Sequence, residues 1–120
     1  MKKEQAIPSK VSRARVRSHF RDAYSLSGEQ IEILLKSSAR SLDTFLSALD
    51  DVVGNGEDLP QISRFGHGLK GVLLNMGEDG WAELARDIEY SAAEGEKKDY
   101  KKIVAAIRLG VEEILEVSDR

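Results

Sequence analysis

The sequence contains no cysteine, two prolines and two histidines in 120 residues. Without cysteine the chain cannot form a disulfide framework, a thiol nucleophile, an iron–sulfur cluster or the usual thiolate zinc site. Two histidines do not suffice for a three-histidine metal site. No apolar run approaches the roughly 20 residues of a membrane span, and no apolar segment follows the N-terminal lysines as in a secretory signal. We therefore expect a cytoplasmic protein with one core and no membrane contact.

The net charge of −3 is unevenly distributed along the chain. Residues 1–21 carry seven Lys or Arg side chains and one acid, a net +6, so the remaining 99 residues carry −9. A basic segment on an acidic body can contact nucleic acid, lipid headgroups or an acidic partner. Alternatively, it docks on the acidic body of its own chain or stays solvated. The lack of interleaved aromatic residues, which would stack on bases, favours this alternative.

Apolar residues recur at helical spacing over most of the chain. Ser27 and Gln30 form a capping-box pattern before the clearest series, and Gly54-Asn55-Gly56 follows it. That series, with 4-3 spacing, is Ile31, Leu35, Ser38, Leu42, Phe45, Leu49 and Val52. A second helix is predicted to begin near Asp58, with Pro60 in its first turn, and to end at Gly77. Its apolar seam is Ile62, Phe65, Leu69, Val72 and Met76.

Two further helices are predicted after this pair. The third extends from about Asp79 to Glu94-Gly95, and the fourth is one continuous helix whose apolar residues are Tyr100, Ile103, Ile107, Val111 and Ile114. A shorter helix near the N-terminus, with Val16, Phe20, Ala23 and Tyr24, is expected to pack across one end. Short connections make neighbouring helices antiparallel. We predict an all-α, up-down-up-down antiparallel four-helix bundle over residues 27–120, preceded by a basic arm and short helix over residues 1–26.

His67 lies on the wrong side of its helix for a core residue. At about 100° per residue it falls about 170° from the centre of the apolar seam, and so faces water. Three glycines between positions 66 and 71 each cost a helix about 1 kcal/mol relative to alanine. We interpret them as leaving room for a partner to reach the imidazole, and the alternative is an exposed histidine without function. The same outer face carries Ser63, Arg64, Lys70, Gly71 and Leu74.

The segment His67-Gly68-Leu69-Lys70-Gly71, with Gly77 ten residues after the histidine, resembles the signature of the histidine-containing phosphotransfer (HPt) family of two-component phosphorelays. The resemblance covers about residues 27–118. Two positions depart from the family pattern, because Gly66 stands where alanine is usual and Gly68 where serine or threonine is common. Neither departure removes a functional group.

The resemblance implies that His67 carries the phosphoryl group on Nε2, since a neutral imidazole is a good nucleophile near pH 7. It implies that Lys70 neutralises phosphoryl oxygens, that Gly71 permits close approach and that Arg64 adds positive potential. Glu89 on the third helix is expected to orient the histidine, with a merely solvated carboxylate as the alternative. Receiver docking is expected at Ser63, Gly68 and Leu74, with Leu74 as the apolar centre of the patch.

These implications predict a phosphorelay intermediate. It would accept a phosphoryl group from a receiver aspartate or a hybrid sensor kinase and pass it to another response-regulator receiver. It would be a monomeric phosphocarrier without kinase activity or cofactor, since the sequence has no glycine-rich phosphate loop, and magnesium would belong to the receiver. The alternatives are a helical adaptor that binds a receiver without phosphotransfer, and a nucleic-acid-binding module that uses residues 1–21. His19 lacks a following lysine–glycine pair and is expected to be structural or incidental.

Overall fold

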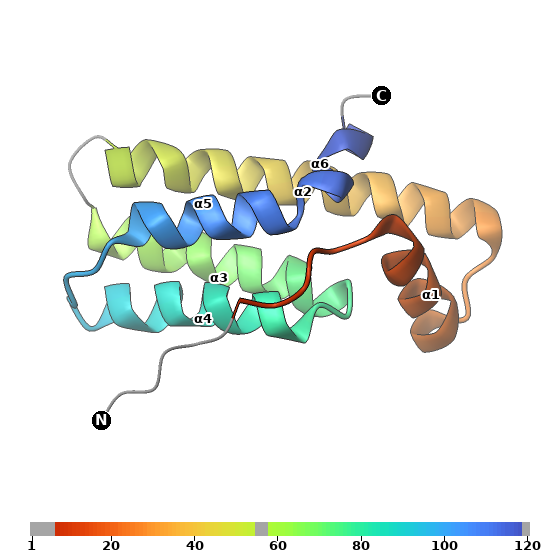
Figure 1. Ribbon diagram of the computed structural model, residues 1–120, viewed down its shortest axis with the longest axis horizontal. Helices are drawn as coiled ribbons and strands as arrows, with labels where there is room; N and C mark the ends of the chain where they lie inside the picture. The colour runs from red at the N-terminus through yellow and green to blue at the C-terminus, as the bar shows by residue number, and fades with distance from the viewer. Residues whose placement is uncertain (1–6, 55–57, 119–120) are drawn as a thin grey trace.

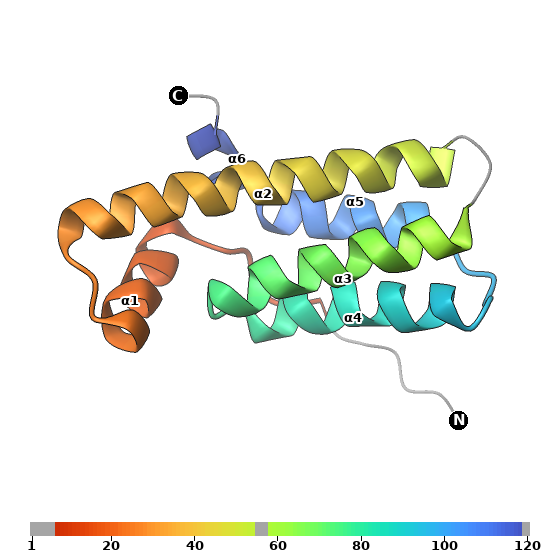
Figure 2. The same ribbon diagram turned by 180° about the vertical axis from the view of Figure 1, so that it is seen from behind.

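The computed structural model describes residues 7–54 and 58–118 of the chain. These residues form six helices and no strand. The helices are α1 (Arg13–Tyr24), α2 (Gly28–Gly54), α3 (Leu59–Asn75), α4 (Asp79–Ala93), α5 (Tyr100–Gly110) and α6 (Glu112–Ser118). Helices α2 to α5 lie side by side along the long axis of the molecule, and α1 lies across one end (Figures 1 and 2). The predicted all-helical class is confirmed. No helix in the described part of the chain is both long enough and apolar enough to cross a membrane.

Local capping interactions set the start of the two longest helices. At α2, the Ser27 N–H donates to Gln30 Oε1 at 2.9 Å and the Gln30 N–H donates to Ser27 Oγ at 3.2 Å, which confirms the capping box. At α3, the Asp58 carboxylate accepts the Gln61 N–H at 3.2 Å, and Pro60 lies in the first turn as predicted. Helix α2 ends at Gly54, and the other two residues of the predicted stop, 55 and 56, lie outside the described residues.

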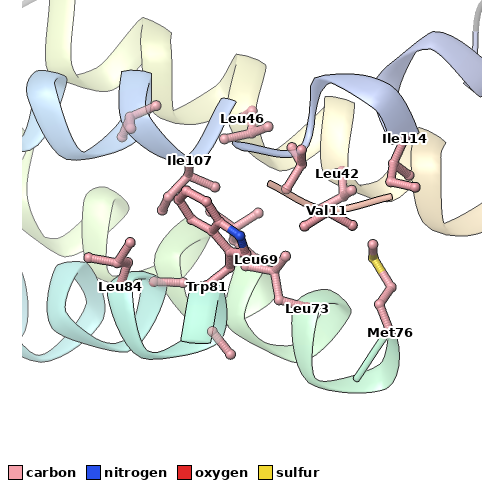
Figure 3. Packing of buried hydrophobic residues seen from close by; sticks show 14 of the residues in the cluster. Val11, Leu42, Leu46, Leu69, Leu73, Met76, Trp81, Leu84, Ile107 and Ile114 are labelled. Atoms are coloured by element: carbon pink, nitrogen blue, oxygen red, sulfur yellow. The ribbon is translucent and has the colours of Figure 1, made fainter. Parts of the chain in front are cut away.

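The core joins aliphatic side chains from α2 to α6 with the indole of Trp81 (Figure 3). The predicted apolar seams are correct in part. Phe45 and Val72, which were predicted to belong to these seams, are only half-buried, while the neighbouring Leu46 and Leu73 are fully buried. A straight helix with 3.6 residues per turn drifts by about 20° per heptad relative to a strict 4-3 repeat. Over long helices this drift exchanges neighbouring residues between the core and the edge of the seam.

The predicted last helix is interrupted at Val111, so the prediction of one continuous helix was wrong. The Gly110 carbonyl accepts the N–H of Val11 at 2.9 Å, and the Ile114 N–H donates to Val111 at the same distance rather than to Gly110. The indole of Trp81 lies against Gly110, where a Cβ would overlap it. The N-terminal segment therefore takes the carbonyl that a continuous helix would use, and α6 leaves the direction of α5 (Figure 1).

The basic N-terminal segment is paired with acids of the bundle. Arg15 makes a two-pronged contact with Glu78, donating from Nε and Nη2 to the two carboxylate oxygens at 2.9 and 2.7 Å. The pairs are Lys10–Glu112, Arg13–Glu116, Arg15–Glu78 and Arg17–Glu32. The expectation that this segment docks on its own acidic body is confirmed for these four cations. Lys2 and Lys3 lie outside the described residues.

Helix α1 also holds the turn between α3 and α4. The Tyr24 hydroxyl donates to the carbonyl of Asn75 at 3.0 Å. The His19 ring packs over Gly77, where a Cβ would approach it to 2.5 Å. Gly77 also has φ +78°, a conformation that favours glycine. His19 therefore has a structural role, as predicted, at the end of the helix that carries His67.

Candidate functional site

His67 lies near the middle of α3 with a side chain that is 69% exposed, as the helical wheel predicted. Its Nδ1 lies 2.8 Å from Oε2 of Glu89 on α4. An ionised carboxylate can only accept a hydrogen bond, so a neutral imidazole donates its Nδ1–H to Glu89. The carboxylate thereby selects the tautomer in which Nε2 is unprotonated, and Nε2 is the nucleophilic nitrogen of an exposed ring.

Glu89 contacts Lys70 through its other oxygen. Oε1 lies 2.8 Å from Lys70 Nζ, and the two side chains are 15% and 19% exposed. Oε1 is buried and the contact is not aligned as a hydrogen bond, so we describe it as an ion pair. Burial raises the pKa of the Glu89 carboxyl, but the contacts with Lys70 and His67 outweigh it, and the pKa lies below its usual 4.5. Glu89 is therefore ionised at neutral pH and holds the histidine and the lysine together.

Two small residues of α3 allow α4 to come this close. A Cβ on Gly66 would lie 3.1 Å from the backbone nitrogen of Glu89. The Ser63 hydroxyl donates to the Glu89 carbonyl at 2.8 Å, and Ser63 is half-buried. The interpretation that Gly66 leaves room for a partner was wrong, because the space it leaves is filled by α4. Ser63, expected on the docking face, joins α3 to α4.

The other two glycines near His67, Gly68 and Gly71, differ in the space around them. A Cβ on Gly68 would overlap the ring of Phe45, which reaches over from α2. The interpretation that Gly68 leaves room for a partner was therefore wrong as well, because the Phe45 ring fills that space. Around Gly71 no other group lies within 4 Å of where a Cβ would stand, so this position is open, as expected. The residue after His67 thus packs against an aromatic ring of α2, while His67 itself contacts Glu89 of α4.

The remaining predicted site residues lie on the same outer surface. Arg64 is exposed, and its Nη1 donates to Gln61 on the same helix at 3.3 Å. Leu74 is exposed, as predicted. No group of three side chains able to hold a metal ion occurs in residues 7–54 and 58–118.

The sequence reasoning missed Arg86 and Tyr90. The Tyr90 ring lies directly beside the site, with Lys70 Nζ 5.4 Å from the ring centroid and the Arg86 guanidinium carbon 5.0 Å from it. A helical wheel of α4 could have identified both residues, because Arg86 and Tyr90 are four residues apart on one face of the helix. Tyr90 also directly follows Glu89, which was a predicted site residue.

The fold and the site define a class of protein: an all-helical bundle that presents an exposed, carboxylate-oriented histidine with a lysine one turn away. The family model of the Hpt domain matches residues 29–117, and the chain belongs to this family. Hpt domains function in histidine phosphotransfer in two-component signalling, as phosphocarriers rather than enzymes, and interact with receiver domains. Comparisons with curated proteins and with solved structures gave no significant match. Helix α1 precedes the matched region.

Proposed function

We propose that the chain is a phosphorelay intermediate, built on an up-down-up-down bundle, that carries a phosphoryl group on Nε2 of His67. It accepts the group from a receiver aspartate, or from a hybrid sensor kinase that contains one, and passes it to another response-regulator receiver. The observation that carries this proposal is the contact between His67 Nδ1 and Glu89, which orients an exposed imidazole for attack through Nε2. The monomeric state and the cytoplasmic location stay predictions.

No proton leaves the histidine during the transfer. The Nε2 lone pair forms a bond to phosphorus as the bond from phosphorus to the aspartyl oxygen breaks, and the aspartate carboxylate leaves with that electron pair. The ring becomes positive while Nδ1–H stays hydrogen-bonded to Glu89, whose negative charge stabilises it. Lys70, one turn away, neutralises phosphoryl oxygens. Magnesium and the catalytic aspartates belong to the receiver, and this chain supplies no cofactor.

Replacement of the histidine tests the proposal. We expect His67→Gln to abolish phosphorylation by receivers charged with acetyl phosphate. The melting temperature should stay unchanged, because the side chain is 69% exposed and lies outside the core. The measurement is acid-labile radiolabel on the protein, with a thermal melt of each variant.

The matched control is His19→Gln, which removes the other histidine. It should keep the label and lower the melting temperature, since His19 packs over Gly77. Label retained on His67→Gln would refute the assignment. A wild-type chain that binds receivers but never takes label would be the adaptor of the alternative hypothesis. The nucleic-acid alternative loses support, because Lys10, Arg13, Arg15 and Arg17 are paired with acids of the bundle.

A further inference from the structure

A groove of about 460 Å³ lies between α3 and α4 and begins at Lys70, the cation that pairs with Glu89. Leu74 of α3 and Tyr90 of α4 line it, and these two residues are 47% and 48% exposed. Ala82 of α4, which is almost fully buried, lies in the same lining. Single exposed apolar residues are ordinary, but two that share one groove next to His67 give a charged concave surface an apolar centre, which a partner can bind.

The charges of the groove change along α4. Its lining is acidic at Asp79 and Glu83 and becomes basic at Arg86, one turn before Tyr90. The ion pair between Arg86 and Glu83 is long, at 3.7 Å, and both side chains are about half exposed. Such a pair is weak, and a guanidinium has five N–H donors in a planar fork that suits a carboxylate. Arg86 can therefore bind an acidic group of a partner by donating hydrogen bonds to it.

The groove lies within the area that a phosphoryl donor must cover. A standard interface buries about 800 Å² per partner, a disc of roughly 16 Å radius. Leu74 follows His67 by seven residues on α3, which is about 10 Å along the helix axis. Tyr90 directly follows Glu89. A receiver that brings its aspartate to His67 therefore covers the groove in the same encounter.

We propose that this groove selects the receiver. It takes one aliphatic side chain of the receiver between Leu74 and Tyr90, and a carboxylate beside that side chain pairs with Arg86. The inference rests on the proposed function and adds to it the residues of this chain that distinguish one receiver from another. Leu74, Arg86 and Tyr90 make no contact with His67, unlike Glu89, so we expect these three residues to act on receiver affinity and not on the transfer step.

The test uses two single variants of the full chain, Leu74→Asp and Arg86→Glu. The probes are the receiver domains encoded in the chain's own genome, each charged with acetyl phosphate, and transfer rates are measured against receiver concentration. For the receiver that transfers fastest to the wild type, we expect the half-saturating concentration to rise by at least about tenfold, which corresponds to 1.4 kcal/mol. The maximal rate and the melting temperature should stay unchanged.

The matched controls are Leu109→Asp and Lys101→Glu on α5, a helix that packs on α2, α4 and α6. Both residues are exposed, and both controls should behave as the wild type.

The proposal is overturned if the groove variants match these controls, or if the maximal rate falls at an unchanged half-saturating concentration. It is also overturned if they change only the monomer–dimer equilibrium in sedimentation, since the groove would then bind a second copy. If Leu74→Asp does not fold, Arg86→Glu alone tests the proposal, because the Arg86 side chain is 51% exposed and its replacement should leave the fold intact. A wild-type chain that takes no label from any receiver would refute the proposed function itself.

Discussion

At the scale of single residues, Glu89 links His67 to the cation beside it, Lys70. One carboxylate contacts both His67 Nδ1 and Lys70 Nζ at 2.8 Å. In the resting protein Lys70 is therefore paired with Glu89. In the proposed transfer, the arriving phosphoryl group would give Lys70 a second anion to neutralise beside the Glu89 carboxylate.

Lys70→Ala should slow phosphotransfer without abolishing it, because the ammonium stabilises charge but does not form the new bond. By analogy with the loss of one oxyanion donor, we expect a loss of about 2–4 kcal/mol of transition-state stabilisation. Rapid-quench transfer from a charged receiver measures the rate, and a thermal melt shows whether the fold has changed. A wild-type rate in this variant would contradict the role given to Lys70.

The lowered pKa of Glu89 predicts a pH dependence of stability. A carboxyl whose pKa in the folded state lies below its usual 4.5 stabilises the fold above that pH, and this contribution is lost as the pH falls through the folded-state pKa. The free energy of unfolding of the wild type should therefore exceed that of Glu89→Gln at pH 7, and the difference should shrink below pH 4.5. Urea denaturation at pH 7 and at pH 3 measures it. A difference that stays constant or grows at pH 3 would show that the contacts of Glu89 do not stabilise the charged form.

At the scale of helices, the surroundings of His67 depend on how closely α2 and α4 approach α3. Gly66 and Ser63 bring α4 to the histidine, and Gly68 accommodates Phe45 of α2. A helix with alanine at these positions would be intrinsically more stable. The glycines therefore serve the packing of neighbouring helices at the cost of helix propensity.

A double-mutant cycle on Gly68 and Phe45 tests this view. Gly68→Ala should destabilise the wild type, because the new methyl group overlaps the Phe45 ring. In the Phe45→Ala background the same change should stabilise the protein by up to about 1 kcal/mol, the helix propensity that alanine regains. The coupling free energy from urea denaturation should exceed about 1 kcal/mol. Equal effects in both backgrounds would mean that the ring moves aside without cost.

At the scale of the whole molecule, the N-terminal segment and the bundle share one core. Val11, Val16 and Phe20 are buried in the same cluster as the residues of α2 to α6, and Figure 3 shows Val11 among them. Four cations of this segment pair with acids of the bundle, so the larger part of its positive charge is neutralised within the chain. The two parts are therefore expected to unfold together.

The pairs Arg15–Glu78 and Arg17–Glu32 provide a matched comparison of these contacts. Glu78 is 6% exposed, so Arg15→Ala leaves a buried carboxylate without its two charge-assisted hydrogen bonds and should destabilise the fold by about 2 kcal/mol. Glu32 is 56% exposed, so Arg17→Ala should cost less than about 1 kcal/mol. Urea denaturation at equal salt compares the variants. An equal loss in both would mean that burial of the carboxylate does not decide the strength of these pairs.

The amino-acid sequence by itself determined the features that depend on neighbours along the chain. The capping box at Ser27, the start of α3 at Asp58 and the turn at Gly77 each follow from a few adjacent residues. The exposure of His67 and Leu74 follows from helical periodicity alone, since neither depends on which helix packs opposite. These features made the all-helical class and the outward-facing histidine predictable.

The tertiary structure alone decided the features that join residues distant in sequence. The ring over Gly68 comes from 23 residues earlier, and the break after Gly110 depends on a hydrogen bond from Val11. Such contacts depend on the rotational phase and separation of packed helices. The drift of 3.6 residues per turn against a 4-3 repeat makes the phase of a long helix uncertain from sequence. The groove between α3 and α4 exists only once both helices have taken their packed positions, because its lining comes from both of them.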